Sequence, residues 1–361
     1  MPAISASIVA ETVWPVLHIS ISLTLAFLVW AMLAPVVGAL IDRGWGGAVM
    51  LYGGIAGALT LVFLSTVTDR WVFSGALLVL GMCMAATLYD PCFALMMRRL
   101  EAGGLEATGT VTLIAGLATL VTFPLVMALS GSLAWGEIVL VFAALAVGAV
   151  LLLPKQDRSA AKPGTCSITS RFKITRGPVL IAFAFGLSMM GHAILLFLLP
   201  IVLSQESGSD KMRILAVAIL GPAQIAGRLV WKGYASRFEP QQCALLLFVL
   251  FCIPPVLLLV SDLGTGLVYG ALIVQGACYG VHTIMRPVLA QRHLPAQHFG
   301  RGLGGIATVG IVMMALGPAL GGWVWSSAGF AGMMLCVFVL NAVGLCLIVA
   351  LSRVKSCEGT A

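Results

Sequence analysis

Four polar side chains recur along the apolar run Gly264–Ala290. They are Gln275, Tyr279, His282 and Arg286, and their spacing of i, i+4, i+7 and i+11 places them on one face of a helix. An amide, a phenol, an imidazole and a guanidinium can together bind a polar solute, and the imidazole can carry a proton near neutral pH. The stripe therefore predicts the wall of a polar cavity, with hydrogen bonds between neighbouring helices as the alternative.

Four more polar residues interrupt apolar runs: Asp90, His192, Gln224 and Arg228. Ionisable groups in apolar surroundings are costly, so they are candidates for function by default. We expect His192 to line the cavity and to carry a coupled proton. Gln224 and Arg228, four residues apart on one helix face, are candidates for anion binding or gating. The structural alternatives are an ion pair for Asp90, a neutral hydrogen-bonded His192, and an Arg228 that reaches the headgroups or caps carbonyls.

Motifs for enzymatic chemistry are missing from the sequence. It contains no Walker loop, no H-E-x-x-H, no G-x-S-x-G and no Rossmann fingerprint, so we expect neither an enzyme nor a cofactor. Nine cysteines and sixteen methionines are compatible with soft metals, but no C-x-x-C or Cys/His cluster is present, and we predict no metal site.

The amino-acid composition indicates that membrane-spanning helices position these polar residues. Hydrophobic residues make up 60% of the 361 residues and charged residues only 9%, against about 25% in soluble proteins. Such a chain must be surrounded by lipid, and its continuous apolar runs indicate helices rather than a barrel. We predict an all-α polytopic membrane protein whose spans are Trp14–Leu40, Ala48–Val67, Trp71–Met96, Thr108–Ser130, Trp135–Leu153, Pro178–Ser204, Arg213–Trp231, Cys243–Ser261, Gly264–Ala290, Gly302–Ser327 and Phe330–Leu351.

Basic residues set the orientation. Most lysines and arginines fall in alternate loops, whereas the opposite loops hold only Arg70, Lys211 and Arg213. By the positive-inside rule, the loop after Leu40, the long loop 154–177 and the C-terminus are cytoplasmic. The net charge of +7 is thus explained by the membrane, and no nucleic-acid partner is expected. We place the protein in the plasma (inner) membrane.

The basic loop 154–177 divides the spans into two sets. Residues 1–153 form an N-terminal bundle of five spans, residues 178–351 a C-terminal bundle of six, and residues 352–361 a cytoplasmic tail. The halves share a pattern, because Asp90-Pro91 and Arg286-Pro287 end the equivalent third and ninth spans. Two bundles around a central cavity are typical of transporters built from repeats. The first half is one span short of this pattern.

The first cytoplasmic loop carries Gly38, Asp42 and Arg43 in the sequence GALIDRGWGG. It resembles the major facilitator superfamily signature G-x-x-x-D-R-x-G-R-R, which lies between the second and third helices of that family. Gly46 and Gly47 replace the usual basic residues, so the ion-pair latch that the resemblance implies between bundles is weakened or built differently. Its position implies that the family's first helix is missing. Gly317-Pro-Ala-Leu-Gly-Gly322 also resembles an element of the penultimate helix.

A finer resemblance is to the monocarboxylate-transporter-like branch. That branch carries Asp-x-x-x-Arg in its eighth helix, where this chain has Gln224 and Arg228. The resemblance implies alternating-access transport of a small organic anion, and the missing carboxylate puts the proton-coupling role of that position in doubt.

We therefore predict a monomeric secondary transporter in the lipid bilayer, coupled to protons, with a small solute such as a monocarboxylate. The alternatives are efflux of drugs or metalloids by the same fold, and a truncated membrane protein that does not transport. The sequence does not distinguish import from export.

The equivalent positions of Asp90 and Arg286 lead to a first prediction. We hypothesise that they close the cytoplasmic gate as an ion pair in the outward-facing state. Asp90→Asn and Arg286→Gln should each impair transport, because either leaves one charge uncompensated at membrane depth. The charge swap should restore part of the flux in vesicles. A swapped protein as inactive as either single variant would exclude the pairing.

Overall fold

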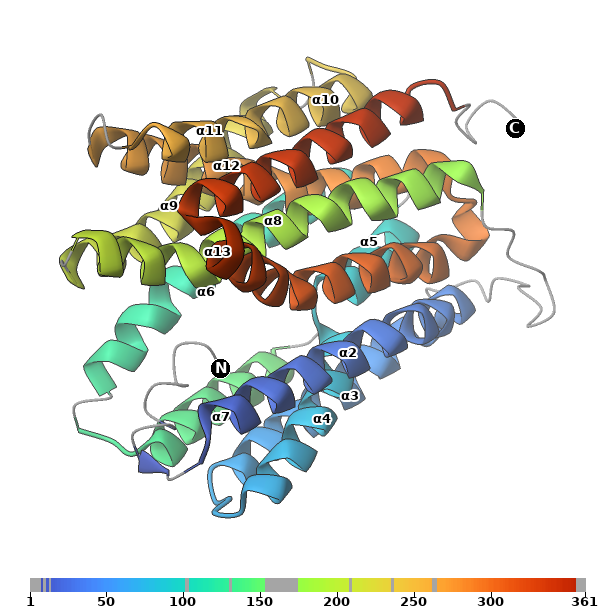
Figure 1. Cartoon of the computed structure of the whole chain (residues 1–361). Helices are drawn as coiled ribbons and strands as arrows, with labels where there is room; N and C mark the ends of the chain where they lie inside the picture. The colour runs from blue at the N-terminus through green and yellow to red at the C-terminus, as the bar shows by residue number, and fades with distance from the viewer. Residues whose placement is uncertain are drawn as a thin grey trace. The chain divides into compact units, whose positions relative to one another are not determined.

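The described residues of the computed structural model are almost entirely helical (Figure 1). The structure describes residues 8, 11–12, 14–100, 104–129, 132–152, 175–207, 210–234, 237–261 and 265–354, and these contain no strand. The N-terminal residues, the linker and the tail lie largely outside this range. Among the described residues, six helical segments are long and apolar enough to cross a membrane. Two of these segments, 47 and 56 residues long, each cover two of the predicted apolar runs. The predicted all-α polytopic fold is confirmed.

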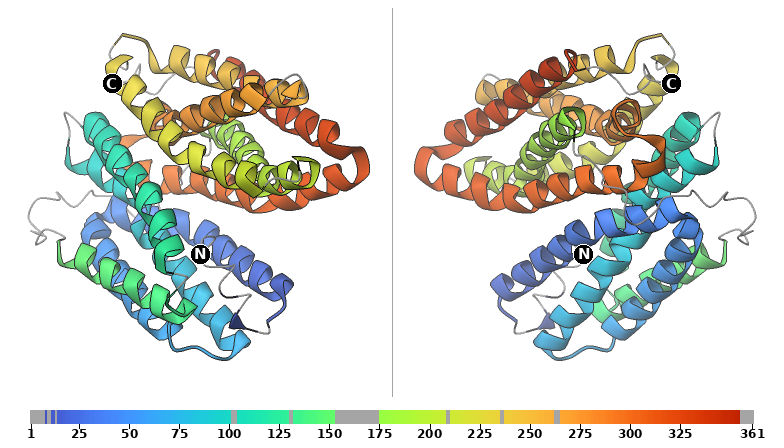
Figure 2. Two further views of the ribbon diagram at one scale, coloured as in Figure 1. Left: turned by 90° about the vertical axis from the view of Figure 1, so that its left-hand side faces the viewer. Right: turned by 90° about the vertical axis from the view of Figure 1, so that its right-hand side faces the viewer.

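The chain forms two compact units, which we describe separately. The first comprises Met1–Gly104, Ala118–Arg171 and Gln297–Thr308. The second comprises Leu105–Leu117, Phe172–Ala296 and Val309–Ala361. The helices of each can be followed from the side views in Figure 2. The predicted bundle boundaries at residues 153 and 178 stay a prediction.

The first unit is built from α2 (Val16–Leu40), α3 (Gly46–Leu64), α4 (Arg70–Thr87), α5 (Tyr89–Arg99) and α7 (Trp135–Leu151). A short π-helix, η1 (Ile41–Trp45), joins α2 to α3, and α6 (Gly104–Leu129) contributes its second half. α4 packs against α2 and α3, and α3 also packs against α7. One hydrophobic core cluster of this unit contains the fully buried side chains of Leu64, Phe73, Leu77 and Ile138.

The third predicted span, Trp71–Met96, is broken at Leu88. The backbone of Leu88 is extended, with φ −80° and ψ −161°, and α5 starts at the next residue. Pro91 explains the break, because a proline ring clashes with the carbonyl of the residue four positions earlier, here Thr87. The break places Asp90 in the first turn of α5, where free N–H groups favour a negative charge.

The start of α4 is fixed by an exposed carboxylate. Asp69 accepts hydrogen bonds from the main-chain N–H groups of Trp71 and Val72, at 2.8 and 3.0 Å. The bonds from Val72 and Trp71 lower the pKa of the Asp69 carboxyl, since they stabilise its charged form. Asp69 is therefore an N-cap, in a loop between two spans.

The second unit contains α8 (Arg176–Ser207), α9 (Asp210–Tyr234), α10 (Pro240–Phe251), α11 (Ile253–Leu259) and α12 (Thr265–His293). The predicted run Cys243–Ser261 is interrupted between α10 and α11, because Pro254 and Pro255 cannot donate main-chain hydrogen bonds.

The last two predicted runs form one element, α13 (Phe299–Leu351), which follows the short 3-10 helix η4 (Ala296–His298). The element bends sharply at Gly329, which has a φ of 68°. Residues with a side chain rarely adopt this backbone conformation, so glycine is favoured here. The first turns of α13, up to Thr308, belong to the first unit, and the remainder belongs to the second.

α9 and α12 approach each other closely in the second unit. A β-carbon on Gly227 would overlap the carbonyl of Ala277, and one on Gly280 would overlap the carbonyl of Gln224. A β-carbon on Gly276 would lie 2.7 Å from that of Ala223. Glycine is therefore required for this contact, which is how small residues bring helices together in membranes.

This contact leads to a second prediction. Gly280→Val should lower the free energy of unfolding by at least about 1–3 kcal/mol, because α9 and α12 must separate to admit the side chain. Thermal unfolding in detergent measures the effect. Gly270→Val on the same helix is the matched control, because a β-carbon there meets nothing within 4 Å. Equal stability of both variants would show that the close approach is not required.

Candidate functional site

Polar residues of α8 and α12 meet inside the second unit. The His192 ring stacks on the Tyr279 ring with centroids 3.5 Å apart and an angle of 8° between the planes. Gln275 Nε2 lies 3.2 Å from His192 Nδ1. An amide nitrogen only donates, so Nδ1 accepts this bond, and the proton of the neutral imidazole is on Nε2. His192 and Gln275 are both buried, as expected for a preorganised polar cluster.

His282 occupies the next turn of the same stripe. Its Nε2 lies 2.8 Å from Ser188 Oγ and 3.2 Å from the carbonyl oxygen of Phe185, while the Ser188 hydroxyl donates to that carbonyl at 2.9 Å. A proton on Nε2 satisfies all three contacts, because the carbonyl can only accept. The rings of Phe185 and Phe251 pack around the imidazole, with centroids 4.7 and 5.8 Å away. His282 is thus held in one orientation in an apolar shell.

Arg286 continues the stripe and is 8% exposed. Its Nη1 lies 3.8 Å from the position that a β-carbon on Gly310 of α13 would take. α12 remains helical through Pro287, unlike the chain at the matching Pro91. The stripe predicted from spacing therefore extends without interruption from Gln275 to Arg286.

Arg228 is buried against main-chain oxygens. Its Nη1 donates to the carbonyl of Thr112 at 2.8 Å, and its Nε donates to that of Gly280 at 3.3 Å. These contacts correspond to the carbonyl-capping alternative that the sequence left open. Gln224, one turn earlier on α9, is half-buried. Its main-chain carbonyl, not its side chain, is the group that approaches Gly280. The role of Gln224 in binding stays a prediction.

Asp90 is buried in the first unit, at the start of α5. The members of the cluster on α8 and α12 belong to the second unit. The proposed pairing of Asp90 with Arg286 stays a prediction.

Comparison with known proteins identifies the family. The sequence model of the Major Facilitator Superfamily matches residues 1–304 and, in a second match, residues 181–357. The chain belongs to the major facilitator superfamily. It is a multi-pass integral membrane transporter rather than an enzyme, as the sequence predicts.

Solved structures with the same fold support this membership. The crystal structure of the human organic anion transporter MFSD10 (TETRAN) is 18% identical, with a TM-score of 0.70 over 91% of this chain and 83% of that chain. The E. coli fucose:proton symporter FucP is 16% identical, with a TM-score of 0.69 over 92% and 90%. Among curated proteins, none matches the chain by sequence.

The superfamily loop motif forms a defined contact inside the first unit. The two carboxylate oxygens of Asp42 accept hydrogen bonds from the main-chain N–H groups of Gly300 and Arg301, each at 2.8 Å. These N–H groups lie in the first turn of α13, so the carboxylate satisfies donors that the helix itself leaves free. Arg98 donates to the carbonyl oxygens of Ile41 and Asp42.

Glycines make the Asp42 contact possible. A β-carbon on Gly38 would overlap the carbonyl of Gly300. Gly44 has a φ of 91°, which turns the chain after the half-buried Arg43. The motif therefore holds the chain after α2 against the start of α13 by a carboxylate that binds backbone donors.

Sequence reasoning missed two partners of the site. Ser188 bonds to His282 and lies one turn before His192 on α8, so the i−4 spacing is the signal that could have found it. Thr112 binds Arg228 through its carbonyl, which no sequence pattern reveals. The structure brings Gln275, Tyr279 and His282 of the predicted α12 stripe together with His192 of α8.

The motif contact leads to a third prediction. Asp42→Ala should lower the free energy of unfolding by about 1–2 kcal/mol, because two buried N–H groups at the start of α13 lose their acceptor. Thermal unfolding in detergent measures this loss. Asp42→Asn keeps one acceptor oxygen and should recover part of the stability. If both variants were as stable as the parent, the carboxylate would not be stabilising this helix start.

Proposed function

We propose that this protein is a proton-coupled secondary transporter of a small organic anion, such as a monocarboxylate, working by alternating access. The observation that carries the proposal is the cluster of the buried His192 and Gln275 with the half-buried Tyr279 on α8 and α12. Polar groups at membrane depth are costly and mark solute or proton pathways in transporters.

The distribution of buried charge favours an anionic solute. Among the described residues, the buried charged side chains of the second unit are Arg228 and Arg286, whereas the buried carboxylates Asp42 and Asp90 belong to the first. Two cationic groups in a low-dielectric region attract an anion more strongly than they would in water. Arg286 is the stronger candidate for the anion site, because it lies on the same α12 stripe as Gln275, Tyr279 and His282.

Proton coupling is supported by the two histidines. Each imidazole is held by hydrogen bonds that fix its orientation, and each can take a second proton when an anion arrives to compensate its charge. We take His192 as the carrier: a second proton goes to Nδ1, and the Gln275 amide can turn to accept it through Oε1, a buried atom that has no hydrogen-bond partner in the described structure. The chain shares its fold with a human organic anion transporter and a fucose:proton symporter, which agrees with both parts of the proposal.

We also propose an oligomeric state, a membrane and an orientation for the transporter. The protein works as a monomer in the plasma (inner) membrane, with the central loop and the C-terminus in the cytoplasm. It belongs to the monocarboxylate-transporter-like branch, from which it departs at Gln224. Gln275, Tyr279, His282 and Arg286 line the solute pathway.

Transport in proteoliposomes tests the proposal and is the fourth prediction. An inward proton gradient should drive uptake of a monocarboxylate such as lactate, and Arg286→Gln should reduce it at least about tenfold, the effect of losing about 1.4 kcal/mol of anion binding. His192→Ala should abolish the dependence on the gradient, because the proton carrier is lost.

Tyr279→Phe keeps the ring that stacks on His192 and removes only the phenol, so it should reduce uptake less than Arg286→Gln does. Uptake that ignores the gradient would overturn the coupling, and full anion uptake by Arg286→Gln would overturn the anion site. Flux of lipophilic drugs or arsenite without any carboxylate flux would favour the efflux alternative.

A further inference from the structure

The rings of His192 and Tyr279 stack more closely than two neutral rings favour. Their centroids are 3.5 Å apart and their planes are 8° from parallel, so the rings lie almost directly over one another. Neutral aromatic pairs favour offset or edge-to-face arrangements at about 4.5–7 Å, because their electron-rich faces repel each other. The other described ring pairs of the second unit obey this preference, at 4.7 to 6.1 Å. The His192–Tyr279 pair is the exception.

A positive charge reverses this preference. A cation placed over the face of an aromatic ring is attracted by the negative potential of that face. Imidazole becomes such a cation when its second nitrogen is protonated. In His192 the second proton goes to Nδ1, where Oε1 of Gln275 can accept it. The superposed rings therefore have the arrangement that an imidazolium on a phenol face requires.

Charge compensation by a carboxylate is not at hand in the described part of the second unit. Glu239 is the only carboxylate there whose side chain the structure describes. It is 66% exposed and pairs with Arg292 at 2.7 Å. Arg292 follows Tyr279 on α12 by about 20 Å at 1.5 Å per residue, so this ion pair is far from the stack. A buried charge on the imidazole must be compensated by other groups.

The other buried ionisable or polar groups around the stack carry no negative charge. α12 contributes Cys278, His282 and Arg286, and α9 contributes Arg228. α13 contributes the neutral amide of Asn341, and α10 contributes aromatic rings. Two of these side chains are guanidinium groups, which repel a second positive charge. The Tyr279 face is thus the group in van der Waals contact that favours the charged imidazole.

Of the two histidines, only His192 lies over this face. The centroids of Tyr279 and His282 are 5.4 Å apart although their planes are within 12° of parallel, so these rings are displaced sideways. The Nε2 atom of His282 is held by Ser188 and by a carbonyl of α8. The geometry therefore distinguishes the two imidazoles, and it favours a positive charge on His192.

We propose that Tyr279 is the positioning residue for the coupled proton, and that its ring face stabilises the positive charge of His192 once Nδ1 is protonated. The aromatic face, and not the phenol hydroxyl, has this role. The inference rests on the proposed proton coupling and names the residue that makes His192 the carrier.

Titration of His192 by nitrogen NMR tests the proposal and is the fifth prediction. The full chain with 15N-labelled histidine is placed in liposomes, and the signal lost in His192→Ala identifies His192. Tyr279 is replaced by phenylalanine and by its mono-, di- and trifluorinated forms, which keep the ring while fluorine withdraws electrons from its face. The pH of half-protonation should be similar for tyrosine and phenylalanine. It should fall with each fluorine, by about one unit for three.

Two further variants control for packing. Trifluorophenylalanine in place of Phe197, a residue of α8 that is 42% exposed, should leave the titration of His192 unchanged. Tyr279→Leu removes the aromatic face and should lower the pH of half-protonation at least as much as three fluorines do. The fluorinated series tests the proposal even if Tyr279→Leu does not fold, because every member keeps the ring.

Proton-driven uptake by the parent protein in the same liposomes separates this inference from the proposed function. A stepwise fall together with gradient-driven uptake supports both. Equal titration across the fluorinated series would overturn the role of Tyr279, while gradient-driven uptake by the parent would show that the coupling itself survives. A stepwise fall with uptake that ignores the gradient would overturn the coupling, and with it the carrier role, although the contact between charge and ring would remain.

Discussion

A polar atom at membrane depth must find its partner inside the protein, because lipid offers none. This constraint accounts for the contacts that shape the second unit. His282 bonds to Ser188 and to a carbonyl of α8, and Arg228 binds the carbonyls of Thr112 and Gly280. Each of these bonds ties two helices together at a fixed register. The same residues that are costly to bury therefore determine how the helices of the site align.

Small residues allow those bonds to form. Gly280 lets α12 lie against the backbone of α9, which brings Arg228 within reach of the Gly280 carbonyl. In the first unit, Gly38 and Gly300 let α2 approach the start of α13, and Asp42 then binds free N–H groups there. In both units the polar contact depends on the close approach of the two backbones. A larger residue would separate the donor from its acceptor.

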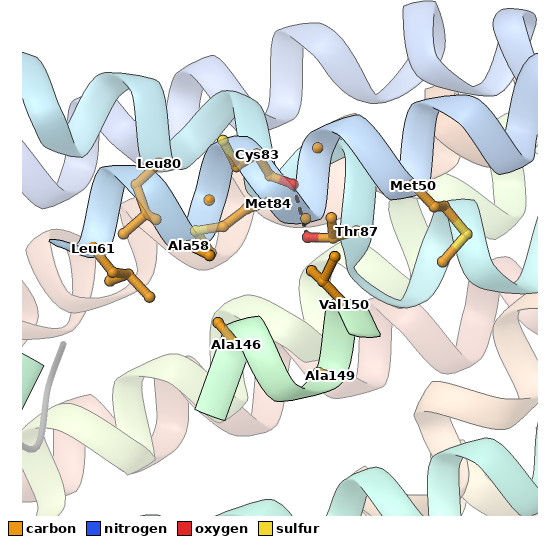
Figure 3. Close-up of a pocket in the computed structure, with 13 residues that line it drawn as sticks. Met50, Ala58, Leu61, Leu80, Cys83, Met84, Thr87, Ala146, Ala149 and Val150 are labelled. Atoms are coloured by element: carbon orange, nitrogen blue, oxygen red, sulfur yellow. Dashed lines mark hydrogen bonds between the residues drawn. The ribbon is translucent and has the colours of Figure 1, made fainter. Parts of the chain in front are cut away.

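The two units use similar sequence patterns with different outcomes. Asp90-Pro91 interrupts a helix, whereas Arg286-Pro287 leaves α12 continuous. The difference positions Asp90 at a helix N-terminus and Arg286 on an unbroken polar stripe. In the first unit, α3, α4 and α7 line an apolar groove (Figure 3). Similar sequence patterns thus lead to different local structures, because the helix breaks and the glycines differ between the two units.

The sequence by itself determined the helical class, the positions of most helices and the polar face of α12, because apolar length and helical period are local properties. It also identified the superfamily through Gly38, Asp42 and Arg43. Only the tertiary structure decided that Arg228 binds carbonyls, that Asp42 binds the main-chain N–H groups of Gly300 and Arg301, and that Ser188 orients His282. These contacts join residues distant along the chain, and main-chain partners leave no signature in residue types.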